Sequence, residues 1–458
     1  MIIRLAGSLR TLMMEKMKLC RCFPAMLMTL ILLSFGTVAP AQTGSADARA
    51  KGALTNWYRL VLELVRHTPT YSPPVASRAF AYIGVTGYEA VASGSGDMIS
   101  LAGQLNGLGA APPRDTAQLY DEAVVLDAAL ATAVQDFFAN TGPTGQRAMA
   151  AMAKSQMAAA ATGVDSTVAA RSQAYGELLA LHIIDWSKTD GGAVIENMGF
   201  PLEYPLAKGS GLWTPTSLIR QQQLPLLPNW GKNRTFSMPE TADCGLPAPT
   251  DYSEDPASAL YKQAVEVMDI KANLTDEQKK IARFWSDDPM LSPTPPGHWV
   301  SIALQILQRD QADINTSVDV MARLGISVAD AFIANWKTKY QYNTLRPITY
   351  IRKMMEPKWD ALLITPPFPE YPSGHSTQSG AAATVLTAIW GDGFAFEDAT
   401  HADDGMAPRP YPSFWAAADE AALSRIYGGI HFRPGIEDGL DQGRCVGDFV
   451  NALKTLEE

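Results

Sequence analysis

Apolar residues recur three and four positions apart over long stretches of this chain, and this spacing restricts its fold more than any other feature. The pattern runs through residues 57–65, 77–92, 117–139, 145–162 and 166–188. An α-helix brings such positions onto one face, whereas a half-buried strand needs strict alternation. Because no part of the chain shows a βαβ rhythm, we predict an all-α protein.

The helical pattern resumes in the second half, after a long irregular segment. Residues 190–258 are rich in proline, which is unusual inside a compact domain and indicates a structured surface excursion. Thr275 and Gln278 predict a capping box at the start of a helix that runs to about Trp285. Further helices are predicted over residues 255–270, 298–312, 316–340, 376–390, 412–427 and 437–456.

The 458 residues are too many for one small core. We therefore predict two helical bundles that divide near residue 265, one over residues 42–265 and one over residues 266–458. The second bundle is expected to carry the active site, because the residues with the clearest chemistry all lie in it.

The first 41 residues predict a secretory signal peptide. A basic stretch precedes the short apolar run 23–38, and Ala39-Pro40-Ala41 offers small residues to a signal peptidase. The mature chain would start near Gln42 and would be secreted or periplasmic, without membrane association after cleavage. An uncleaved membrane anchor is the alternative interpretation.

The net charge of -10 argues against nucleic acid as a partner, since phosphate backbones need a basic face. Two cysteines, Cys244 and Cys445, lie beyond the predicted signal peptide. An exported protein could pair them in a disulfide, but they could equally be unpaired. No spacing of cysteines and histidines is typical of a zinc site.

Three short segments carry the residue types of an anion site. They are Lys339 to Arg346-Pro347, Pro372-Ser373-Gly374-His375, and Ser424-Arg425 to His431. Lys339 and Arg346 are predicted to lie on one helix, where their spacing of seven residues places both on the same face. Arg425 would add a third cation, and the planar guanidinium of arginine matches tetrahedral oxyanions.

The second segment precedes a predicted helix, whose first N–H groups favour an anion. Ser373 offers a hydroxyl and Gly374 an unobstructed N–H, while His375 can move protons near neutral pH. His431 could coordinate a metal or attack phosphorus. Since unpaired buried charges are costly, this collection of cations predicts a bound counter-anion.

The three segments together resemble the signature of the type-2 phosphatidic acid phosphatase superfamily, in order and in spacing. Within that superfamily the chain looks most like the vanadium-dependent haloperoxidases. The resemblance extends to the segments at 72–81, 212–216 and 284–289, and small phosphatases of the superfamily are generally shorter. Trp336 and Phe368 fall where haloperoxidases line the vanadate pocket with aromatic rings.

This resemblance implies a role for each residue. Lys339, Arg346, Arg425, Ser373 and Gly374 would bind vanadate, a cofactor whose place phosphate could also take. His431 would be the axial ligand of vanadium, His375 the acid–base residue, and Lys339 the cation acting most directly on the peroxide. The implied partners are hydrogen peroxide, a halide ion and a small organic acceptor, and an oligomer is possible.

Some positions depart from the family pattern. Gly435 stands where many members have an aspartate, so Glu437 or Asp438 could orient the second histidine instead. Asp287 or Asp288 is the candidate for a carboxylate beside Arg425. His298 could lie near the pocket or be a structural residue. Phe368 occupies a position where bromide-type enzymes often have histidine, and the halides are left unranked.

Two other functions remain open from the sequence. An acid phosphatase would use the same pocket, with His431 as the nucleophile that forms a phosphohistidine and His375 as the proton donor. A non-catalytic oxyanion-binding protein would need neither histidine, yet both are present. The chain length and the additional segments favour the haloperoxidase.

Overall fold

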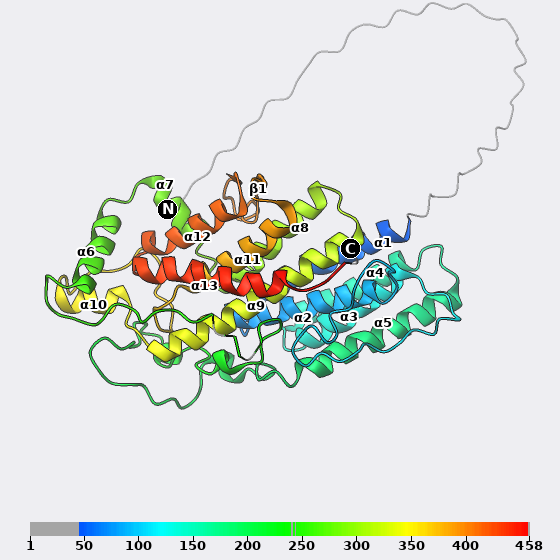
Figure 1. Cartoon of the computed structure of the whole chain (residues 1–458), viewed down its shortest axis with the longest axis horizontal. Coiled ribbons are helices and arrows are strands. Elements are labelled where there is room, and N and C mark those ends of the chain that lie inside the picture. Colours follow the sequence, from blue (N-terminus) through cyan, green and yellow to red (C-terminus); the bar gives the residue numbers. More distant parts are fainter. Residues whose placement is uncertain (1–44, 240, 243, 457–458) are drawn as a thin grey trace, which may run out of the picture. The chain divides into compact units, whose positions relative to one another are not determined.

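The computed structural model describes residues 45–456, apart from residues 240 and 243. The predicted all-α fold class is confirmed, with one small two-stranded ribbon added (Figure 1). In chain order the α-helices are α1 (Ala46–His67), α2 (Pro73–Ala92), α3 (Glu122–Phe137), α4 (Pro143–Ala160), α5 (Ser166–Ser187), α6 (Ala259–Ala272), α7 (Asp276–Phe284), α8 (Thr294–Arg309), α9 (Ile314–Tyr342), α10 (Pro347–Met354), α11 (Gly374–Trp390), α12 (Phe414–Tyr427) and α13 (Arg433–Asn451). The 3-10 helices η1 (Glu196–Gly199), η2 (Arg220–Gln223) and η3 (Trp230–Lys232) and the antiparallel strands β1 (Phe396–Asp398) and β2 (Arg409–Tyr411) complete the described elements.

Polar residues explain where many of these helices begin. A side-chain oxygen accepts a hydrogen bond from an N–H of the first turn at Ser45, Asp121, Asp165, Ser258, Thr275, Asp313, Ser373 and Ser413. Those N–H groups have no partner within their own helix. The predicted capping box is confirmed, because Thr275 and Gln278 each bond to the other's backbone.

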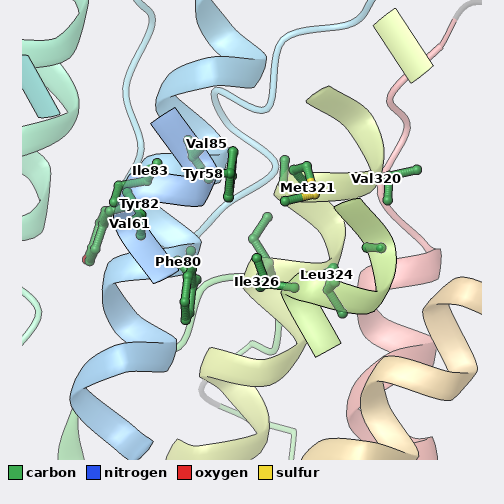
Figure 2. Packing of buried hydrophobic residues seen from close by; sticks show 14 of the residues in the cluster. Tyr58, Val61, Phe80, Tyr82, Ile83, Val85, Val320, Met321, Leu324 and Ile326 are labelled. Atoms are coloured by element: carbon green, nitrogen blue, oxygen red, sulfur yellow. The ribbon is translucent and has the colours of Figure 1, made fainter. Parts of the chain in front are cut away.

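Helices α2 and α9 pack closely together, and two glycines make this possible. A Cβ atom on Gly84 would lie 2.8 Å from the carbonyl oxygen of Met321, and one on Gly325 would lie 2.6 Å from that of Phe80. Figure 2 shows the buried side chains on both sides of this contact, including Phe80 and Met321. One continuous core therefore extends from the first helices of the chain into α9.

Helix α11 is enclosed by the other helices of the C-terminal half. It contacts α8, α9, α12 and α13, and every residue from Ser376 to Leu386 is buried. In Figure 1, α11 to α13 form the orange and red group. Gly443 of α13 brings two backbones together, since a Cβ atom there would lie 2.2 Å from the carbonyl oxygen of Thr377. This tight packing fixes the N-terminus of α11, where the second predicted motif lies.

The proline-rich segment 190–258 has only 3-10 helices among its regular elements in the described residues, in agreement with the predicted irregular structure. Its backbone is hydrogen-bonded to the C-terminal half, from Trp213 N to Asn343 O at 2.8 Å and from Leu226 N to Pro367 O at 2.9 Å. Cys244 and Cys445 form a disulfide that joins the segment to α13, which resolves the question that the sequence left open.

The predicted signal peptide, residues 1–41, lies outside the described residues. Among the residues that are described, no helix combines the length and the apolar character that a membrane span requires. These residues belong to one unit by backbone proximity. The division into bundles over residues 42–265 and 266–458 stays a prediction.

Candidate active site

The first predicted motif is divided between two helices. Lys339 lies in the last turn of α9, and Asn343 then takes up a left-handed backbone conformation with φ of 51°. Arg346 is the residue before α10, whose first residue is Pro347. The prediction that Lys339 and Arg346 share one helix is therefore wrong. Proline suits the first turn of a new helix but not the interior of an existing one.

The ammonium group of Lys339 is fully buried among backbone carbonyls. Nζ donates to the carbonyl oxygens of Pro369 at 3.0 Å and Glu370 at 2.9 Å, and also to that of Pro372. These acceptors can use all three ammonium protons, so Lys339 fixes the loop that leads into α11. Burial and the charge of Arg346 lower the pKa of Lys339 well below its ordinary value.

The second motif forms the start of α11. Ser373 caps the helix, its Oγ accepting a hydrogen bond from the backbone N–H of Ser376 at 3.2 Å. The ring of His375 is hydrogen-bonded to the backbone of Trp285, and its Nε2 is buried with no partner in the described residues. Burial and the charge of Arg425 lower the pKa of His375 well below its ordinary value, so the ring is neutral.

The third motif meets the other two. Arg425 extends from α12 and donates from Nη1 to the carbonyl oxygen of Trp285 at 2.9 Å, so it shares this backbone partner with His375. His431 follows α12, and its Nε2 lies 3.0 Å from Nη1 of Arg346. Because a guanidinium can only donate, Nε2 of His431 is the acceptor and Nδ1 carries the ring proton.

Glu370, which the sequence analysis did not single out, orients the ring of His431. Its Oε1 accepts a hydrogen bond from Nδ1 of His431 at 2.7 Å and another from the backbone N–H of Phe432 at 3.2 Å. A carboxylate behind a ligating histidine fixes both the ring and its tautomer. Glu370 therefore has the orienting position that the sequence analysis assigned to other residues.

The glycine at position 435 leaves the space that this carboxylate fills. A Cβ atom on Gly435 would lie only 2.6 Å from Oε1 of Glu370. The substitutes predicted for the missing aspartate are wrong, because Glu437 is exposed and Asp438 accepts a hydrogen bond from the hydroxyl of Tyr371 at 2.8 Å. The carboxylate is thus supplied by a different segment of the chain.

Polar atoms without a partner in the described residues surround His431. They are Nη2 of Arg346, Nε of Arg425 and Nε2 of His375. Burial lowers the pKa of Arg346 to about 9 and that of Arg425 to about 10, so both charges lack full compensation. An anion with several oxygens would satisfy these atoms and balance the charge. The oxyanion site, as we call Arg346, Ser373–His375, Arg425 and His431, therefore fits vanadate or phosphate.

A cavity with a volume of about 460 Å³ opens onto this site. Gly374, His375, Arg425 and His431 line its polar end, while much of the remaining wall is apolar. Pro69 and Ser72, between α1 and α2, and Pro73, the first residue of α2, contribute to that wall, so the N-terminal half helps to enclose the cavity.

The two aromatic residues predicted for the pocket lie together at its wall. The rings of Trp336 and Phe368 are tilted against each other with centroids 4.9 Å apart, and both line the cavity. The ring of Phe368 also lies 5.3 Å from Nζ of Lys339 and 5.1 Å from the guanidinium carbon of Arg346. Phe368 thus stabilises two buried cations through its ring face and excludes water from them.

The two candidates for a carboxylate beside Arg425 differ in their surroundings. Asp287 and Asp288 both line the cavity. The charge of Asp288 raises the pKa of Arg425 more than the charge of Asp287 does. Asp287 faces away toward two histidines, 2.9 Å from Nδ1 of His298 and 3.1 Å from Nε2 of His401. Asp288 is therefore the better match for the predicted role. His298, left open by the sequence, is fully buried behind Asp287.

Comparison with known proteins relates this arrangement to one family. The family described as "VCPO second helical-bundle domain" matches residues 319–456. The vanadium chloroperoxidase of Curvularia inaequalis is 24% identical over 211 residues, which are 33% of this chain and 35% of that protein. The match thus spans about a third of this curated relative.

Solved structures extend the likeness over most of the chain. The crystal structure of a bacterial vanadium-dependent iodoperoxidase matches with a TM-score of 0.82 and 37% identity, covering 89% of this chain and 98% of that one. A holo-type bacterial vanadium-dependent chloroperoxidase shares the fold, with a TM-score of 0.66 and 16% identity over 84% of this chain and 92% of its own. The chain therefore belongs to the family of vanadium-dependent haloperoxidases.

Proposed function

We propose that this chain is a vanadate-dependent haloperoxidase that oxidises iodide with hydrogen peroxide. The main support is the set of polar atoms on Arg346, Arg425 and His375 around the ring of His431 that have no partner among the residues the structure describes. In the overall reaction, hydrogen peroxide, iodide and one proton give hypoiodous acid and water. The choice of iodide rests on the 37% identity to a bacterial iodoperoxidase.

Some residues of the site would donate hydrogen bonds to vanadate, and Lys339 would act without contacting it. Arg346 and Arg425 would bind vanadate oxygens through their unused N–H groups. The start of α11, with Ser373 and Gly374, would add backbone N–H groups and the partial positive charge of a helix N-terminus. Lys339 would act through its charge and through the loop that it fixes, because its protons already face three carbonyls.

His431 would be the protein ligand of vanadium. Its Nδ1 proton is held by Glu370, so Nε2 has the lone pair, which accepts a hydrogen bond from Nη1 of Arg346 and would exchange that bond for vanadium. The hydrogen bond to Glu370 also makes the imidazole a stronger electron donor. These contacts explain how one histidine can be kept in the tautomer that a metal ligand needs.

Vanadate, when bound, would supply a Lewis acid that polarises hydrogen peroxide without changing its own oxidation state. The chain would supply the proton chemistry. His375 is neutral and its Nε2 has no partner in the described residues, so it can accept a proton from hydrogen peroxide as the peroxide binds. Arg425, which shares the Trp285 carbonyl with His375, would fix the distance between this base and the anion.

The cavity suits a large polarisable halide and a small organic acceptor. Trp336 and Phe368 give it an apolar wall next to the cations, and iodide gives up its hydration water more easily than smaller halides. The organic acceptor would meet the oxidised halogen inside or just outside this cavity.

The decisive experiment compares vanadate-loaded protein with the apoprotein. Both are assayed for oxidation of iodide, bromide and chloride by hydrogen peroxide, and for hydrolysis of a phosphate monoester. We expect vanadate-dependent oxidation that is fastest with iodide. Ester hydrolysis by the apoprotein without any halide oxidation would support an acid phosphatase instead. Vanadate binding with neither reaction would leave only an oxyanion-binding protein.

A variant of the proposed vanadium ligand tests the assignment within the site. His431→Ala should bind no vanadate in equilibrium dialysis and should oxidise no iodide, because it removes Nε2, the proposed ligand atom. His67→Ala, in an exposed histidine of α1, serves as the matched control and should behave like wild type. Full turnover in the His431 variant would contradict the assignment.

We also propose that the protein is exported. The signal-like residues 1–41 and the disulfide between Cys244 and Cys445 support this localisation. N-terminal sequencing of protein recovered outside the cytoplasm should begin near Gln42, and recovery of unprocessed chain in the cytoplasm would contradict the proposal.

A further inference from the structure

Behind the wall of the cavity, two histidine rings converge on a single carboxylate. Asp287 lies in the loop between α7 and α8, His298 in the first turns of α8, and His401 in the loop after β1. Asp287 Oδ2 lies 2.9 Å from Nδ1 of His298, and its Oδ1 lies 3.1 Å from Nε2 of His401. One ligand atom from each of the three residues lies within 4.8 Å of the other two.

The far nitrogen of each ring is bonded to a second carboxylate. Nε2 of His298 lies 2.7 Å from Asp398, and Nδ1 of His401 lies 3.1 Å from Asp404. Metal-bound histidines commonly have this arrangement, in which an outer carboxylate fixes the ring and strengthens it as an electron donor. We call Asp287, His298, His401, Asp398 and Asp404 together the Asp–His cluster.

The inner residues of the cluster are shielded from solvent. Asp287 is 2% exposed, His298 0% and His401 5%. The indole of Trp285 stacks on the ring of His298 with centroids 4.3 Å apart. The backbone of Asp287 has a φ of 48°, an uncommon conformation for a residue with a side chain, which the surrounding contacts must hold in place.

A divalent ion can enter the cluster without a change in net charge. A ring whose two nitrogens both donate to carboxylates carries two protons and one positive charge. A divalent cation between Asp287, His298 and His401 would replace one proton on each ring, so two positive charges leave and two arrive. The separations of 2.9 Å and 3.1 Å from Asp287 to the two rings are close to the spacing of about 3.3 Å that tetrahedral zinc with bonds of about 2.0–2.1 Å imposes on its ligands.

We propose that Asp287, His298 and His401 bind a divalent transition-metal ion of the zinc class, separate from the vanadate site. Imidazole nitrogens favour such an ion over calcium or magnesium. The ion would lie directly behind the oxyanion site, since Asp287 lines the cavity and the neighbouring Trp285 carbonyl bonds both Arg425 and His375. It would fix the segment that positions these two residues.

The test measures metal in the full-length, vanadate-loaded protein. Protein is stripped with a chelator, dialysed against Zn²⁺ and then against metal-free buffer, and zinc and vanadium are determined by mass spectrometry. We expect one retained zinc per chain. A parallel sample with Co²⁺ should give the visible absorption of cobalt with nitrogen ligands. A wild-type protein that retains no zinc and gives no such absorption would overturn the proposal.

Variants locate the ion. His401→Gln should lose the retained zinc, whereas His182→Gln, a control in a histidine outside the cluster, should keep it. Asp404→Asn should weaken zinc binding about 10–100-fold, the usual effect of removing an outer carboxylate. Asp404 is 26% exposed, so this variant remains informative if His401→Gln does not fold. Zinc retained equally by Asp404→Asn and wild type would place the ion elsewhere and overturn the proposal.

These readouts do not depend on the proposed reaction. Zinc retention with no halide oxidation would leave the metal site standing and remove only the proposed function. Vanadate-dependent halide oxidation with no retained zinc would have the opposite meaning.

Discussion

The oxyanion site and the Asp–His cluster lie on two sides of the segment from Trp285 to Asp288, yet they contain buried charge in opposite states. In the oxyanion site, Arg346 and Arg425 keep N–H groups that no acceptor in the described residues uses. In the Asp–His cluster, His298 is bonded to a carboxylate at both nitrogens. Unused donors indicate a site for a ligand that brings its own charge. Donors that are already paired need no ligand, so the cation that we propose would enter only by displacing protons.

The largest effect is expected in the oxyanion site, from His375, whose Nε2 has no partner in the described residues. His375→Ala should lower iodide turnover about 10²–10⁴-fold, the range for removal of a general acid–base group. Vanadate binding should be nearly unchanged, because Arg346, Arg425 and His431 remain. Steady-state kinetics and equilibrium dialysis measure the two quantities. Parallel loss of vanadate and turnover would instead make His375 a binding residue.

On the other side, removing one carboxylate should destabilise the whole fold. Asp398→Ala leaves an N–H of the fully buried His298 without an acceptor and should lower the free energy of unfolding by about 3–5 kcal/mol. Glu397→Ala, at the exposed neighbouring position of β1, is the control and should cost little. Equal denaturant midpoints for the two variants would show that the cluster is not a paired-charge network.

A buried carboxylate that belongs to neither site sharpens the comparison. Asp127 of α3 is fully buried and accepts a hydrogen bond from Nε1 of Trp57 at 2.7 Å, and burial raises its pKa to about 6. The pKa of Asp127 is higher in the folded than in the unfolded protein, so the protonated carboxyl contributes to the free energy of unfolding. This contribution is complete below about pH 4 and is lost as the pH rises through about 6.

Asparagine at position 127 cannot titrate. Over that pH range the free energy of unfolding should therefore fall by about 3 kcal/mol more in the wild type than in Asp127→Asn. Urea unfolding at several pH values measures the difference, with Asp115→Asn in an exposed carboxylate as the control. Identical pH profiles for the wild type and the Asp127 variant would mean that the carboxylate is already compensated.

The smallest effect is expected from Glu370. This residue is a carboxylate paired with a histidine, as in the Asp–His cluster, but it lies within the cationic oxyanion site. Glu370→Gln keeps an acceptor for the ring of His431 but removes the charge, and should weaken vanadate binding about 10–100-fold. Glu437→Gln, at the exposed position that the sequence analysis put forward, should bind as wild type does. The reverse order of effects would restore the sequence-based assignment.

The sequence predicted the features that depend on local patterns. Helical spacing gave the fold class, and the capping box at Thr275 was found because its two residues lie three positions apart. The three motifs were found because the superfamily spacing within each is fixed. Their meeting follows from α11 being enclosed by α8, α9, α12 and α13.

Features that depend on long-range contacts were missed or misassigned. Glu370 and Gly435 are 65 positions apart, and only their contact in space shows that one compensates for the other. Arg346 was placed on the helix of Lys339 because spacing alone does not show that Asn343 ends that helix. The ligand atoms of the Asp–His cluster come from three separate elements, so no zinc-like spacing could reveal them. Strands of three residues, such as β1, are too short for an alternating pattern.

The reciprocal glycine contact between α2 and α9 bears on how such enzymes can change over time. Gly84 presses on the backbone of Met321, and Gly325 presses on that of Phe80, so any larger residue on one helix demands a shift in the other. Recombination between relatives that replaces the segment with α2 but not the segment with α9 should therefore be poorly tolerated, because the new chain would contain only one of the two matched helix surfaces. Exposed side chains on the loops around the cavity, such as Leu291 and Ile364, are the freer material for new specificities.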